Sequence, residues 1–118
     1  MKPRVLFTVT SDPRTSPRPA EAVRIAAGVG AWEKVEVTLY LHDAAVLALG
    51  ETAEELVDGE HFIRYLPLLT GRARPIYVQR GAPLFDGLEL GRDGVPFEPI
   101  EEKRLAELAA SSQYVVRF

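Results

Sequence analysis

Short apolar runs and helical patterns alternate along the chain from its first residues onward. Residues 5–9 form an apolar run rich in β-branched and aromatic side chains, which is typical of a strand buried on both faces. A polar loop with three prolines follows at 10–19. Apolar residues then recur at helical spacing up to Ala31, and Pro19 suits the first helical position. A strand that leads through a polar loop into a helix predicts the start of a βαβ fold.

The same alternation continues to the end of the sequence. Apolar runs predict strands at 35–41, 75–79 and 113–118, and helical spacing predicts helices at 44–49, 62–71 and 101–110. Residues 84–99 are rich in glycine and proline, and either a short edge strand or a single helical turn fits them.

This order of elements predicts an α/β protein with a single domain over residues 1–118. We expect a three-layer α/β/α sandwich with a mostly parallel sheet of about five strands. The runs around Val5, Val37 and Tyr77 are nearly continuous in apolar residues and need cover on both faces, so they are expected to be central. The strand around Val115 is expected to be parallel as well.

Two polar positions carry helix-cap signals. Asp43 precedes the apolar residues 44–49 and is expected to cap that helix, with Gly50 ending it. Thr52 and Glu55 have the spacing of a capping box, so a short helix is expected to begin there. For Asp43 this structural role is favoured over a chemical one.

Composition narrows the class of protein. The length of 118 residues suits one domain, and 47% apolar with 26% charged residues is ordinary globular usage. The net charge of -3 provides no electrostatic surface for nucleic acid. No apolar run approaches the roughly 18 residues of a membrane span, and the N-terminal segment lacks the apolar core of a signal peptide. We therefore expect a cytoplasmic protein that binds neither nucleic acid nor membrane.

The lack of cysteine is the most informative feature of the composition. It removes disulfides, thiolate metal sites and every cysteine-based mechanism. Asparagine is also missing, and nine prolines are present. The loss of thermolabile residues fits a thermophilic source, whereas eleven arginines against three lysines fit a GC-rich genome, and both explanations stay open.

Polar residues gather where three of the predicted strands end. The carboxyl ends of parallel strands meet at one edge of a sheet, so these residues are expected to line one rim, where open α/β sheets bind ligands. Arginine suits the geometry of phosphate and sulfate. The candidate ligand-binding residues are Ser11, Asp12, Arg14, His42, Gln79 and Arg80, with Arg18 as a further candidate for an anion.

Each candidate also has a structural interpretation. Ser11 and Asp12 suit a turn that organises their loop, His42 suits a hydrogen-bonded surface position, and the arginines suit solvated loop charges. The Gly-rich phosphate loops, the GxSxG elbow and zinc-ligand spacing are all missing from the sequence. No catalytic residue, metal or cofactor is therefore predicted.

Several stretches share a pattern of apolar strands and small-residue turns. They are residues 5–13 with the alanine-rich helix after them, 37–46, Tyr65-Leu66 and 76–81. Together they resemble the DsrE/DsrF-like family, which includes the sulfur-relay proteins of TusD type. The resemblance covers most of the chain and implies the DsrE-like fold.

The resemblance also implies where chemistry would take place. In the sulfur-transferring members, a cysteine near the end of the strand at 75–79 or in the following loop carries a persulfide. Gln79 falls near that position here, so the fold carries over without the chemistry. The resemblance implies a non-catalytic binding or accessory protein of sulfur metabolism. The alternative is a small-molecule or anion-binding sensor, or a small enzyme, that uses the polar residues of the rim.

Three kinds of partner are expected. Proteins of this family commonly assemble, so a small symmetric homo-oligomer is expected, and a different protein partner is the second candidate. A small anion is the third, held by Arg14, Arg80 and free amides of the first helix. The apolar residues expected either at the oligomer interface or folded over the local core are Leu84, Phe85, Leu88, Leu90, Val95 and Phe97.

Overall fold

Five parallel strands form one continuous sheet. The computed structural model describes residues 3–50, 52–70, 75–81 and 96–118. The strands are β1 (Arg4–Val9), β2 (Glu36–Leu41), β3 (Ile76–Gln79), β4 (Phe97–Ile100) and β5 (Tyr114–Arg117). Their order across the sheet is β4-β3-β2-β1-β5, and every neighbouring pair is parallel. The predicted parallel sheet of five strands is therefore confirmed, with β1, β2 and β3 in the centre.

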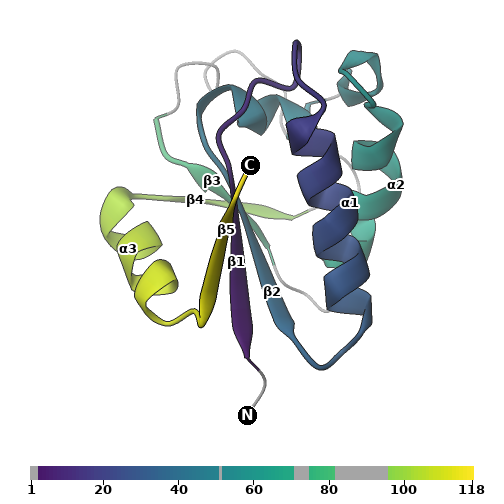
Figure 1. The fold of residues 1–118 in the computed structure, drawn as a ribbon. Coiled ribbons are helices and arrows are strands. Elements are labelled where there is room, and N and C mark those ends of the chain that lie inside the picture. The colour runs from purple at the N-terminus through teal and green to yellow at the C-terminus, as the bar shows by residue number, and fades with distance from the viewer. Residues whose placement is uncertain (1–2, 51, 71–74, 82–95) are drawn as a thin grey trace.

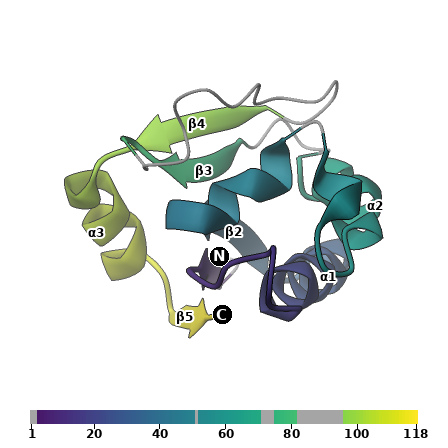
Figure 2. The same cartoon turned by 90° about the horizontal axis from the view of Figure 1, so that it is seen from above.

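Helices cover both faces of this sheet. Helix α1 (Arg18–Ala31) connects β1 to β2, α2 (Glu60–Leu69) precedes β3, and α3 (Glu102–Ala110) connects β4 to β5. Figure 1 shows the strands between the helices, and the view from above in Figure 2 places α1 and α2 on one face and α3 on the other. The predicted three-layer α/β/α sandwich is thus the observed architecture. No helix within the described residues is long and apolar enough to cross a membrane.

The register of the central strands decides which side chains face each layer. β1 pairs with β2 along its whole length, from Arg4 opposite Glu36 to Val9 opposite Leu41. Because side chains alternate along a strand, Phe7 and Val9 point toward α1 and α2, while Leu6 points toward α3.

The two faces are packed unequally. The core on the side of α1 and α2 is large and is built from aliphatic and alanine side chains, including Val9, Val23, Leu39, Phe62 and Leu66. Among the described residues, the cluster on the side of α3 has Leu6, Tyr40 and Ile100 as its buried members. Most of the hydrophobic stabilisation therefore comes from the first face, since this term scales with the apolar area removed from water.

The two predicted caps are wrong in detail. Residues Asp43–Leu49 form a 3-10 helix, η1, whose N-cap position belongs to His42 and not to Asp43, and the His42 side chain makes no cap hydrogen bond. Asp43 has a φ of 50°, so it lies inside the first turn in a left-handed conformation instead of preceding the helix. Residues Ala53–Glu55 form a second short 3-10 helix, η2, and Thr52 makes no side-chain cap bond to it.

Helix α1 begins one residue earlier than predicted. Pro19 occupies its second position, and the first belongs to Arg18, whose amide donates to the Ser16 hydroxyl at 3.1 Å. A proline fits either position because amides in the first turn have no intrahelical partner.

The glycine- and proline-rich region contains a strand at its end. Of the two alternatives for residues 84–99, the edge strand is found, as β4. Pro99 lies in β4, and proline is tolerated there because β4 is an edge strand. Phe97 packs against the main core. Of the two alternatives for the apolar residues of this region, an oligomer interface or packing over the local core, the second is confirmed for Phe97. Leu84, Phe85, Leu88, Leu90 and Val95 lie outside the described residues.

Candidate functional site

The carboxyl ends of β1, β2 and β3 meet at one rim of the sheet, as the parallel arrangement requires. Val9 ends β1 directly opposite Leu41 at the end of β2, and β3 continues the row with Gln79. The loops that follow these three strands bring the predicted site residues to this rim.

Gln79 joins β3 to the segment after β2. Its side-chain oxygen Oε1 accepts a hydrogen bond from the main-chain amide of Asp43 at 2.8 Å. The neighbouring His42 holds the same segment to β1, because its amide donates to the carbonyl of Val9 at 2.9 Å. The His42 ring nitrogen Nδ1 lies 3.2 Å from Oδ2 of Asp43. The structure therefore brings Gln79 and His42 together through Asp43, which was not among the predicted ligand-binding residues.

Asp12 organises the loop after β1. Its carboxylate accepts the main-chain amide of Arg14 at 2.9 Å, and the Arg14 guanidinium contacts both carboxylate oxygens at 2.8–3.2 Å. Hydrogen bonds from the Arg14 side chain hold the pKa of Asp12 below its ordinary value, and the Arg14 amide adds to the effect. The turn-forming role suggested for Asp12 is confirmed, and the charge of Arg14 is balanced within its own loop.

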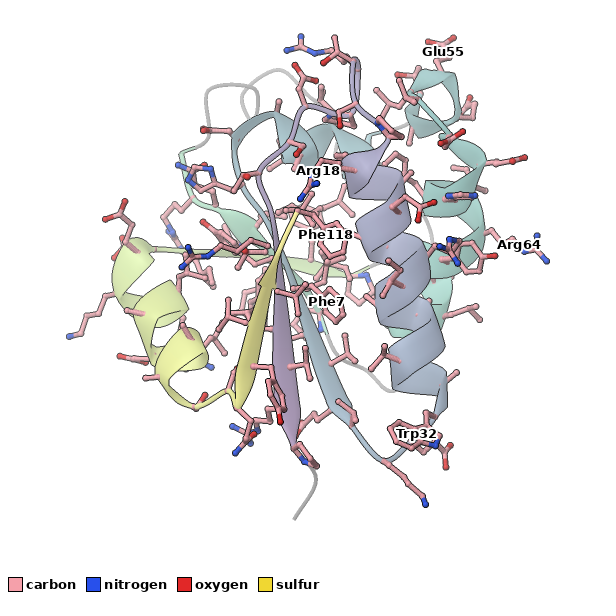
Figure 3. The ribbon with its side chains drawn as sticks, viewed as in Figure 1. Phe7, Arg18, Trp32, Glu55, Arg64 and Phe118 are labelled. Carbon is pink, nitrogen blue, oxygen red and sulfur yellow. The ribbon has the colours of Figure 1, made fainter. Side chains whose placement is uncertain are left out.

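Residue Phe118 closes the rim between β1 and α1. The ring of Phe118 stacks on that of Phe7, with 6.1 Å between the two centroids. The Arg18 guanidinium lies 5.6 Å from the centroid of the Phe118 ring. Figure 3 shows Arg18, Phe118 and Phe7 one above another beside α1. The Phe118 carbonyl accepts the amides of Thr10 at 2.9 Å and Ser11 at 3.3 Å.

The three arginines of the predicted anion site have separate partners. Arg14 is paired with Asp12, and Arg18 donates to the carbonyl of Arg117 at 3.3 Å. Arg80 lies at the other side of the rim and donates to the carbonyl of Pro99 at 3.5 Å. Anion binding between these loops stays a prediction.

The chemistry available at the rim is that of hydrogen bonding. Gln79 offers an amide, Asp12 an ion-paired carboxylate and His42 an imidazole, while the sequence offers no thiol. Among the residues that the structure describes, no group of three or more His, Asp or Glu side chains could hold a metal ion. The contacts of Asp43 with Gln79 and of Phe118 with Phe7 and Arg18 were not predicted, because they join segments that are distant in the chain.

Comparison with known proteins gives a structural likeness. No protein-family model matches the sequence, and no curated protein matches it either. The crystal structure of the ychN protein from E. coli superposes with a TM-score of 0.74 and covers 100% of both chains, at 21% sequence identity. The chain has the fold of ychN, which is DsrE-like. The expected DsrE-like fold is thereby confirmed, and at this identity the likeness concerns the fold alone.

Proposed function

We propose that this chain is a cytoplasmic, non-catalytic binding or accessory protein with a DsrE-like fold, without persulfide transfer of its own. The observation that carries the proposal is Gln79 at the end of β3, with its amide oxygen bonded to the Asp43 amide in a sequence without cysteine. The proposed link to sulfur metabolism rests on the family resemblance of the sequence.

Chemistry supports the non-catalytic part of this proposal. Transfer of sulfane sulfur needs a thiolate, because a thiolate can both attack the donor and hold the transferred atom. The amide of Gln79 donates and accepts hydrogen bonds and is no nucleophile at neutral pH. The thioether of Met1 has no ionisable proton. The alternative function, a sensor or small enzyme at the rim, has less support because the polar side chains of Asp12 and Gln79 are bonded to main-chain amides of the rim loops.

An exposed sheet edge supports the binding part of the proposal. β5 pairs with β1 on one side and ends the sheet on the other. Its apolar side chains are accessible, with 65% of Tyr114, 39% of Val115 and 36% of Val116 exposed. Unpaired strand edges are templates for pairing with another chain, so we propose that β5 is the surface through which the chain assembles with a second copy.

Mass spectrometry of the wild-type protein tests the non-catalytic claim. The protein is incubated with a persulfide donor, desalted and measured intact. We expect no mass increase of one or more sulfur atoms, because no side chain can hold one. A retained sulfane adduct that dithiothreitol removes would overturn the proposal.

A further inference from the structure

One part of the sheet is polar where packing alone would favour apolar residues. By strand alternation, Arg4, Glu36 and Thr38 lie on the same face as Leu6 and Tyr40, toward α3. Parallel sheets normally bury apolar side chains on both faces. Helix α3 has no buried residue and contacts this face through the partly buried residues of its inner side, Leu105, Leu108 and Ala109. The polar residues at the amino-terminal ends of the strands therefore have no packing explanation.

A cavity of about 200 Å³ lies between these strand ends and α3. Its walls come from β1, β2 and β3 on one side and, on the other, from Arg104 and Leu108 of α3 with the two serines after this helix. Figure 2 shows α3 alone on this face, far from α1 and α2. Arg4 and Glu36 are the first residues of β1 and β2, and Pro75 directly precedes β3, so this wall of the cavity is at the opposite end of the sheet from the rim that holds Gln79.

Two guanidinium groups line the cavity from opposite walls. Arg4 on β1 donates from Nε to Glu36 at 3.1 Å, and Arg104 on α3 donates from Nη1 to Glu107 at 3.4 Å. A guanidinium has five N–H donors, so each arginine keeps donors for a ligand. The two side chains are 52% and 51% exposed, so a ligand can reach them from solvent.

Two hydroxyl groups add to these donors. Thr38 and Tyr77 line the cavity and are partly buried, and within the described part of the chain neither hydroxyl has a hydrogen-bond partner. Both side chains are partly exposed, so their hydroxyls can donate to a ligand that enters the cavity from solvent. By contrast, the hydroxyls of Ser111 and Ser112 both donate to the carbonyl of Leu108, at 3.1 and 2.7 Å.

We propose that this cavity binds a small organic oxyanion, a carboxylate or a phosphate monoester. Its charged head meets Arg4 and Arg104, and its body lies against the apolar surfaces of Pro75, Tyr77 and Leu108. Arginine suits both head groups because its planar fork donates two parallel hydrogen bonds. The volume is below the roughly 300–1,000 Å³ of pockets for drug-sized ligands, so the ligand has the size of a small metabolite and not of a nucleotide.

Four probes of matched chemistry test this proposal by isothermal titration calorimetry. Two probes are complete organic anions, 4-hydroxybenzoate and phenyl phosphate. Phenol has the aromatic body without the anionic head group, and inorganic phosphate has the anionic head group without the body. We expect saturable binding of at least one organic anion with a dissociation constant of about 1 mM or lower. Phenol and inorganic phosphate should bind at least about tenfold more weakly, since each lacks half of the contacts. The stronger of the two organic anions identifies the head group.

Arginine variants locate the binding. Arg4→Gln and Arg104→Gln should each weaken binding about tenfold or more, because each removes a charge at the head group. Arg24→Gln is the matched control, since Arg24 pairs with Glu21 at the same i,i+3 spacing on α1, and it should bind like wild type. Thr38→Val tests the site without changing charge and should weaken binding as well. The proposal is overturned if neither organic anion binds saturably up to about 10 mM, or if the Arg4→Gln/Arg104→Gln double variant binds unchanged.

Discussion

At the scale of single residues, polar groups near the rim satisfy one another. Asp12 shows this most directly, because its carboxylate is held by both the side chain and the amide of Arg14. The same is true of Gln79, whose amide oxygen is occupied by the amide of Asp43. Among the residues that the structure describes, Asp12 and Gln79 thus make local structural contacts at the rim.

The pKa of Asp12 reports its pairing with Arg14. In Arg14→Gln we expect the pKa of Asp12 to rise toward its ordinary value of 3.8, and the remaining main-chain hydrogen bond should keep it slightly below that value. NMR titration of the side-chain carboxyl carbon measures it. Arg24→Gln, which breaks a similar surface pair with Glu21, is the control and should leave the pKa of Asp12 unchanged. An equal pKa of Asp12 in wild type and Arg14→Gln would contradict the assignment.

The pairing of Asp12 with Arg14 also predicts how the stability of the folded protein changes with pH. The pKa of Asp12 is lower in the folded than in the unfolded chain, so its ionised form favours the folded state. This contribution is fully present above the unfolded pKa of about 3.9 and is lost as the pH falls through the folded pKa. The exposed position of the pair keeps the effect small.

At the scale of elements, close packing of short helices limits what the sequence tolerates. Gly59 directly precedes α2 and is buried. A Cβ atom there would meet the Ala53 carbonyl oxygen and would lie 2.7 Å from the Glu54 carbonyl carbon, both of which are main-chain atoms of η2. The glycine is therefore needed for the close approach of η2 and α2.

A pair of glycine substitutions tests this approach. Gly59→Ala should lower the free energy of unfolding by about 2 kcal/mol or more, because backbone must shift to admit the methyl group. Gly28→Ala should raise it by about 0.5–1 kcal/mol, since a Cβ there meets nothing within 4 Å in helix α1. Urea unfolding measures both values. Equal stability of Gly59→Ala and wild type would show that η2 and α2 are not packed as described.

Those helices and strands that have a regular pattern of apolar residues could be predicted from the sequence. The run at 5–9 predicted β1, and the run at 75–79 predicted β3, because a strand buried on both faces needs such a sequence. The 3-10 geometry at Asp43–Leu49 was not predictable, because it depends on the left-handed Asp43 and on its bond to Gln79. The contacts of Phe118 with Phe7 and Arg18 join distant segments, and no local pattern encodes them.

At the scale of the whole molecule, the sheet ends in an apolar edge. Three of the six exposed large apolar side chains in the described part of the chain belong to β5. Natural proteins usually protect such edges with charges, prolines or cover. β4, the opposite edge, contains Pro99, whereas β5 contains a tyrosine and two valines followed by one charged residue, Arg117.

Self-association through β5 is measurable by light scattering after size exclusion. At micromolar concentration we expect a mass of about twice the 13.0 kDa of one chain, or a small multiple of it. Val115→Lys should shift the protein to the monomer, because a charged side chain at a strand edge disfavours pairing. Leu68→Lys is the control, since Leu68 is 66% exposed on α2, and it should assemble like wild type. A monomeric wild-type protein would contradict the proposed interface.

We propose that the end of β3 corresponds to the place where sulfur-transferring DsrE-like proteins carry their cysteine, and that the nucleophile is missing there. The most direct test places a thiol there and follows sulfur uptake from a persulfide donor by intact-mass spectrometry. We predict that Gln79→Cys gains a reducible sulfane adduct faster than Thr15→Cys, an exposed thiol in the loop after β1, because the Asp43 amide loses its bond to Gln79 and leaves a partial positive charge near the thiolate at position 79. Uptake by Gln79→Cys that is absent, or no faster than in Thr15→Cys, would contradict the proposal.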